Sequence, residues 1–149
     1  MEKYVLDTGV IVEYIVEKSP RRAKVVNLFN AAARGEVQLF VTPITLSEVI
    51  YVASRLYQVA GIEDPNREAL NFVTWVTGRV TLVELDERIA VRAGELKKTL
   101  RIALPDCYVI ASAEVLGAMP LFRAVEREME SVLNVLKRLS VVFLDELNI

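Results

Sequence analysis

The segment KYVLDTG, residues 3–9, decides the fold, because a short, β-prone apolar run ends there directly in Asp7. Four further runs of this kind occur along the chain, at residues 37–41, 79–85, 119–122 and 141–144. Each is mostly apolar and is bounded by turn or helix-capping residues, which is typical of strands buried on both faces of a parallel sheet. We therefore expect five strands in one sheet, with Asp7 at the end of the first.

Helical segments separate these runs. Thr42-Pro43 and Asp64-Pro65 each place a capping side chain before a proline at the first helical position, and Asp86 is a third capping residue. The expected helices cover residues 19–34, 86–100, 104–117 and 125–139, and two more begin at residues 42 and 64. Alternating strands and helices predict an α/β fold, a three-layer α/β/α sandwich with a mostly parallel central sheet. We expect residues 1–149 to form a single domain of this kind.

The composition excludes several kinds of chemistry. The 149 residues include no histidine and one cysteine, Cys107. This excludes a Ser–His–Asp triad, a Cys–His nucleophile, zinc sites built on histidine or clustered cysteines, and an intramolecular disulfide. Lys and Arg number 18 against 20 Asp and Glu, a net charge of −2, so the chain is not a strongly basic nucleic-acid coat. Catalysis would have to use carboxylates, Lys, Tyr, Ser, Thr or a hard metal ion.

Two features of the chain bear on location and assembly. The N-terminal residues do not resemble a signal peptide, and no apolar stretch reaches the roughly 18 residues of a membrane span. We therefore expect a cytoplasmic protein with no membrane partner. Apolar residues make up 53% of the chain, which predicts a substantial core and favours a homodimer.

Four acids follow or flank the expected strands. Asp7 comes directly after the first strand, Glu48 lies in an apolar helix after the second, Asp106 opens another helix, and Glu126 comes just after the fourth strand. Taken singly, each is explained as a helix cap or as a favourable charge at a helix N-terminus. Ligands of doubly wound sheets bind at the carboxyl ends of the strands, however, and that edge is where we expect these acids to meet.

Carboxylates gathered in this way repel one another. At ~5 Å and an effective dielectric constant of ~20, each ionised pair costs about 3 kcal/mol, so the cluster must take up protons or bind a cation. Oxygen ligands alone select Mg²⁺ or Mn²⁺. Such an ion can orient a water and stabilise charge on a phosphodiester, which is chemistry that needs no histidine.

Four segments resemble PIN-domain ribonucleases, in particular the VapC-like toxins of toxin–antitoxin pairs. The resemblance rests on VLDT at 5–8, TPITLSEV at 42–49, LPDCYVIASA at 104–113 and PLF at 120–122. The chain departs from the family in two places. Gly9 stands where the family often has Ser or Asn, and Arg123-Ala124-Val125 come between the fourth strand and the next acid.

This resemblance implies Mg²⁺- or Mn²⁺-dependent endonucleolytic hydrolysis of single-stranded RNA, and an antitoxin as protein partner. It implies Asp7, Glu48 and Asp106 as catalytic metal ligands. Glu126 is implied as the fourth catalytic acid, and Glu128 is the alternative for that position. Thr8 is expected to hydrogen-bond a metal-bound water.

Three basic residues near these segments are candidates for contacts with RNA phosphates. Arg123 follows a strand at the expected active edge, and Lys98 and Arg101 belong to a basic run just before the Asp106 helix. For Lys98 the alternative is a solvated helix end, where a cation is favoured by the helix dipole.

The sequence also has to be weighed against other functions. The same fold with a weak site could be a binding module, or an RNA-processing factor that acts through a protein partner. A phosphatase of the haloacid-dehalogenase type is disfavoured, because Asp7 is followed by Thr8 and Gly9 instead of a second Asp two residues on. A nucleotide hydrolase is disfavoured by the absence of a glycine-rich phosphate loop.

Overall fold

The computed structural model describes residues 1–149 and contains one five-stranded sheet. The strands are β1 (Glu2–Leu6), β2 (Val37–Val41), β3 (Thr81–Leu82), β4 (Met119–Phe122) and β5 (Val142–Phe143). Every neighbouring pair is parallel, and the strand order is β3-β2-β1-β4-β5. In the register of the central strand, Tyr4 lies opposite Leu39 on one side and Met119 on the other. The parallel sheet predicted from the apolar runs is confirmed.

Seven α-helices connect and flank these strands: α1 (Thr8–Glu13), α2 (Arg22–Ala33), α3 (Pro43–Val59), α4 (Pro65–Thr77), α5 (Glu87–Leu100), α6 (Leu104–Leu116) and α7 (Leu133–Arg138). Two 3-10 segments, η1 (Arg127–Val132) and η2 (Leu144–Glu146), complete the elements. Three of the caps expected from the sequence are present. The side chains of Thr42, Asp64 and Asp86 each accept a backbone N–H in the first turn of α3, α4 and α5.

The structure differs from the expected helices in three places. The short α1 was not expected; it begins directly after β1 because Asp7 caps it. The helix expected from residue 19 begins at Arg22, because the Ser19 hydroxyl instead accepts the backbone N–H of Arg21 and donates to the Glu13 carboxylate. The helix expected over 125–139 is divided into η1 and α7, with Met129 of η1 buried in the core.

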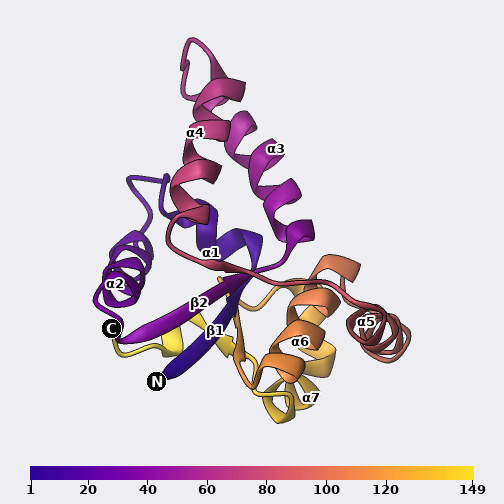
Figure 1. Ribbon diagram of the computed structural model, residues 1–149. Helices are drawn as coiled ribbons and strands as arrows, with labels where there is room; N and C mark the ends of the chain where they lie inside the picture. Colours follow the sequence, from indigo (N-terminus) through magenta and orange to yellow (C-terminus); the bar gives the residue numbers. More distant parts are fainter.

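The helices form two layers, one on each face of the sheet (Figure 1). Alternation along β1 determines the two cores: Tyr4 and Leu6 pack with residues of α1 to α4, whereas Val5 packs with residues of α5, α6 and α7. The three-layer α/β/α architecture is therefore as predicted.

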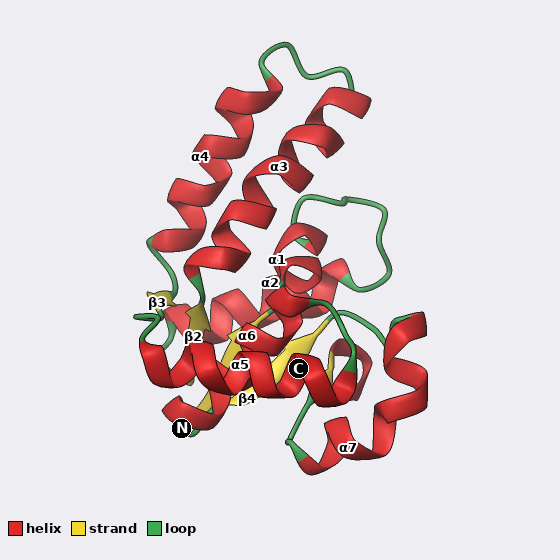
Figure 2. Cartoon of the chain, turned by 90° about the vertical axis from the view of Figure 1, so that its right-hand side faces the viewer, coloured by secondary structure: helices red, strands yellow, loops and turns green.

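Helices α3 and α4 form a hairpin that projects from the sheet, as Figures 1 and 2 show. Several of its apolar side chains stay exposed, including Tyr51 at 54%, Val59 at 88% and Leu70 at 47%. None of the helices combines the length and the apolar character that crossing a membrane requires.

Candidate metal centre

The strand order reverses between β1 and β4, at the centre of the sheet. From β1 the chain moves to β2 and β3 on one side, and it later returns to place β4 on the other side of β1. Asp7 follows β1 and Arg123 follows β4, so both lie at the carboxyl end of this switch point. Open α/β sheets bind ligands at this position.

Asp7 is buried at that edge, with 6% of its surface exposed. Its Oδ1 accepts the backbone N–H of Val10 at 2.9 Å, which holds the carboxylate over the first turn of α1. Burial raises the pKa of Asp7 to about 7, and the charge of Glu126 adds to the rise. A carboxyl group with this pKa is only about half ionised at neutral pH, and a cation bound beside it would favour the charged form.

The tightest group of acids is Asp106, Glu126 and Glu128, each of which offers an oxygen within 4.8 Å of the others. Asp106 lies in the first turn of α6, and the two glutamates lie just after β4. Burial raises the pKa of Asp106 to about 8, with further contributions from the charges of Asp7, the two glutamates and Glu48. The pKa of Glu126 is raised as well, first by burial and then by the charge of Glu128. Both residues considered for the fourth acid therefore belong to one group.

Glu48 lies outside that group but contributes to its charge. It projects from the second turn of α3, and its Oε1 accepts a hydrogen bond of 2.8 Å from the Thr8 hydroxyl of α1. The negative charge of Glu48 raises the pKa of both Asp106 and Glu126. In the structure Thr8 thus orients an acid, and its expected contact with a water stays a prediction.

Arg123 lies among these acids, next to a residue that the sequence analysis did not single out. Its Nη1 is 3.6 Å from Oε1 of Glu13, whose side chain is only 8% exposed. Its positive charge lowers the pKa of Asp7 and of Glu126 against the effect of burial. The available signal for Glu13 was an acid within the apolar run VIVEYIV, since a buried acid requires a partner.

The other two predicted RNA contacts lie near the group without joining it. Arg101 ends α5 in a left-handed conformation, and the loop it begins brings the Ala103 N–H to 3.2 Å from Glu128 Oε1. Lys98 lies one turn earlier on α5, and both basic side chains are exposed and form no ion pair. This basic segment therefore borders the acids at Glu128.

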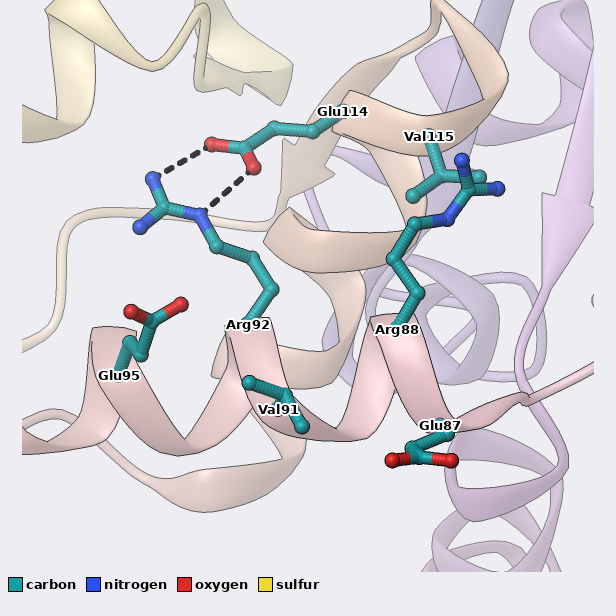
Figure 3. Close-up of a pocket in the computed structure, with 7 residues that line it drawn as sticks. All are labelled: Glu87, Arg88, Val91, Arg92, Glu95, Glu114 and Val115. Carbon is teal, nitrogen blue, oxygen red and sulfur yellow. Dashed lines mark hydrogen bonds and ion pairs between the residues drawn. The ribbon is translucent and has the colours of Figure 1, made fainter.

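A wide groove between α5 and α6 is a separate feature (Figure 3). Arg92 donates from Nε and Nη2 to the two carboxylate oxygens of Glu114 across the groove, at 2.8 and 2.9 Å. Glu114 comes eight residues after Asp106, a distance of ~12 Å along the helix axis. The groove thus lies at the opposite end of α6 from the acids, and one ion pair, Arg92–Glu114, spans it.

The acids fit a hard divalent cation. Asp106, Glu126 and Glu128 offer only oxygen atoms, and Asp7 and Glu48 add negative charge beside them; such a donor set suits Mg²⁺ or Mn²⁺. Zinc sites in proteins typically include histidine or clustered cysteines, and the chain has no histidine and one cysteine. Cys107, next to Asp106, is buried, and burial raises the pKa of its thiol to about 11, which leaves it unreactive.

Comparisons with known proteins agree with this fold. The PIN domain family model matches residues 4–132. A search of curated proteins finds no match. Solved structures are similar over nearly the whole chain at low identity, which indicates a shared fold.

Three of these structures illustrate the similarity. A chain of VapBC2 from Rickettsia felis, bound to a DNA fragment from its promoter, is 16% identical with a TM-score of 0.65, and the match covers 95% of this chain and 96% of that one. VapBC-1 from nontypeable Haemophilus influenzae is 19% identical with a TM-score of 0.64, over 97% and 99%. A toxin–antitoxin complex from Klebsiella pneumoniae is 18% identical with a TM-score of 0.57, over 87% and 92%.

The family model spans most of the chain and includes Asp7, Glu48, Asp106, Glu126 and Glu128. The parallel sheet and the acids at its carboxyl edge agree with that match. The chain belongs to the PIN domain family.

Proposed function

We propose that the chain is a Mg²⁺- or Mn²⁺-dependent endoribonuclease that hydrolyses phosphodiester bonds of single-stranded RNA. The observation that carries the proposal is the group of acids at the switch point of the sheet, two of which have strongly raised pKa values. Carboxylates without a compensating charge destabilise a fold. A cluster of this kind therefore indicates that a cation binds there, or that the protein uses a bound cation in its function. Phosphodiester hydrolysis is a function that benefits from a cation bound by carboxylates.

In this proposal Asp7, Glu48 and Asp106 hold the ion, with Glu126 as the fourth catalytic acid beside Glu128. The bound ion supplies an oriented water of lowered pKa and compensates charge on the phosphate. Thr8 keeps Glu48 turned toward the site through its 2.8 Å hydrogen bond. Glu126, which is exposed, is placed to receive a proton from the attacking water.

The basic residues around the site supply the substrate contacts. Arg123 is placed for a phosphate next to the scissile bond, and Arg101 and Lys98 for phosphates farther along the strand. The depression lined by Glu126, Arg127 and Glu128 opens the site to solvent, as a polymeric substrate requires.

The biological role that we propose is that of a VapC-like toxin in the cytoplasm. It is supported by the family and by the fold shared with chains of toxin–antitoxin complexes. The partner would be an antitoxin protein. The exposed apolar side chains of α3 and α4, such as Tyr51 and Leu70, support assembly as a homodimer.

The test is incubation with a pool of short single-stranded RNAs, with and without Mn²⁺. We expect internal cleavage that requires Mn²⁺ and is lost in Asp106→Asn. Cleavage without metal, or by the variant at the wild-type rate, would refute the proposed site. Metal binding without any cleavage would favour the alternative, a PIN-like binding module or RNA-processing factor that acts through a partner.

A further inference from the structure

Arg123 is built into the acidic site. Its side chain is 43% exposed, but its guanidinium lies 3.6 Å from the buried Glu13, which α1 holds at the rim of the site. The Glu13 carboxylate is fixed in turn by the Ser19 hydroxyl. The arginine therefore has an ion-pair partner beside the acids.

Gly9 provides the space that Arg123 uses. A Cβ added at Gly9 would lie 3.0 Å from Arg123 Cβ and 3.4 Å from its Cδ, and also 3.4 Å from Asp7 Oδ2. The arginine stem and the outer oxygen of Asp7 thus meet over a residue that has no side chain. A Ser or Asn at this position would compete with Arg123 for the same space.

Arg123 places a permanent positive charge on the Asp7 side of the site. Two further acids, Glu13 and Glu126, lie near that charge. Asp106, Glu126 and Glu128 each offer an oxygen close enough to the others to share one ion. A fixed guanidinium repels a second divalent ion and fills part of the room it would need.

We propose that Arg123 is a resident cation that takes the place of a second divalent ion near Glu13 and Glu126, next to the ion that Asp7, Glu48 and Asp106 hold, so that the chain binds one Mg²⁺ or Mn²⁺ instead of two. This inference rests on the proposed metal-dependent function. It explains why Gly9 and Arg123 occur together: the arginine supplies the charge and the glycine leaves it room. If Arg123 served only as a phosphate contact, neutralising it would weaken RNA binding without changing the number of ions bound.

The test is the stoichiometry of Mn²⁺ binding to metal-free protein, by isothermal titration calorimetry and by electron paramagnetic resonance for spin coupling between two ions. Arg123→Gln is the main variant, because glutamine keeps Cβ, Cγ and Cδ over Gly9 but removes the charge. Arg127→Gln is the matched control. It removes the same charge from an exposed residue that lies between Glu126 and Glu128 and forms no ion pair.

We expect one Mn²⁺ per chain in the wild type and in Arg127→Gln, and two, with spin coupling, in Arg123→Gln. Two ions in the wild type would overturn this inference and leave the proposed function intact. One ion in Arg123→Gln, or two in both variants, would also overturn it. Absence of Mn²⁺ binding in all three proteins would instead contradict the proposed function, and this inference with it. Should Arg123→Gln not fold, Arg123→Met, which also removes the charge and keeps a stem over Gly9, takes its place; two ions are expected, and one would overturn the inference.

Discussion

Two groups of charged residues, at different places in the fold, differ in whether their charges are compensated by neighbouring groups. Where α2 meets the C-terminal segment, charges are compensated: Arg21 pairs with Asp145, and Lys24 Nζ donates to the carbonyl oxygens of Leu144, Asp145 and Leu147. At the carboxyl edge of the sheet, acids are gathered with Arg123 as their ion-pairing cation. The first arrangement pairs its charges, whereas in the second the raised pKa values of Asp7 and Asp106 mean that the charged forms of these acids oppose folding. A site that opposes folding is a strong indicator of function.

The largest expected effect is the difference in RNA cleavage between two variants, each of which neutralises an acid in one of the two groups. Asp106→Asn removes a proposed metal ligand of similar shape, and we expect RNA cleavage to fall at least ~1,000-fold, a loss of about 4 kcal/mol of transition-state stabilisation. Asp145→Asn removes an equal charge from the compensated group and should leave cleavage within about twofold of wild type. Both rates are measured on the same RNA pool with Mn²⁺. A comparable loss in the two variants would break the contrast between the groups.

The second effect is stabilisation by metal. Binding to the folded state alone raises the free energy of unfolding, by about 2.7 kcal/mol when the free ion is at 100 times its dissociation constant. We expect millimolar Mn²⁺ to raise the melting temperature of the wild type and of Asp145→Asn, but not that of Asp106→Asn. Differential scanning fluorimetry with EDTA-treated protein measures the shift. An equal shift in all three proteins would place the ion outside the acidic site.

The third effect is the pH dependence of stability without metal. Burial raises the pKa of Asp7 from 3.8 to about 7. The folded chain therefore holds this proton at pH values where the unfolded chain has lost it, and the free energy of unfolding falls as pH rises from about 4 to about 7. We expect Asp7→Asn, whose amide oxygen can still cap α1, to be more stable than wild type by about 1–3 kcal/mol at pH 8 and nearly equal at pH 4.

Urea unfolding in EDTA across that pH range measures this difference, and Asp145→Asn is the control. If Asp7→Asn were less stable than wild type at pH 8, other groups of the folded chain would have to compensate the negative charge of Asp7. The two groups of charges would then not differ in the way described above.

The smallest effect is expected in the α5–α6 groove, which resembles the compensated group. The side chains of Arg92 and Glu114 are 38% and 33% exposed, and such pairs typically contribute less than about 1 kcal/mol. Arg92→Ala should therefore lower the free energy of unfolding by less than about 1 kcal/mol and leave RNA cleavage unchanged. A large loss of cleavage with the fold intact would mean that this groove also binds substrate.

The sequence was sufficient to predict the parallel sheet, because buried strands and proline-capped helices depend on local patterns. Thr42 and Asp64 cap the helices they were expected to cap. The division of residues 125–139 into η1 and α7 was not predictable in this way. It accompanies the burial of Met129 and the contact of Glu128 with Ala103, both of which depend on chain segments distant in sequence.

The candidate site was predictable to a similar degree. Asp7 and Asp106 could be placed at one edge because each follows a recognisable local signal. Three contacts join separate elements: Asp106 lies with Glu126 and Glu128, the Thr8 hydroxyl donates to Glu48, and Glu13 pairs with Arg123. Their geometry depends on side-chain directions that the sequence pattern does not specify.

The central claim is that the acids at the switch point hold a divalent cation. Anomalous diffraction from crystals soaked in Mn²⁺ tests it most directly, because the anomalous signal locates the ion without reference to activity. We expect a peak coordinated by Asp106 together with neighbouring acids of the group. A well-occupied peak elsewhere on the molecule, with none at Asp106, would contradict it.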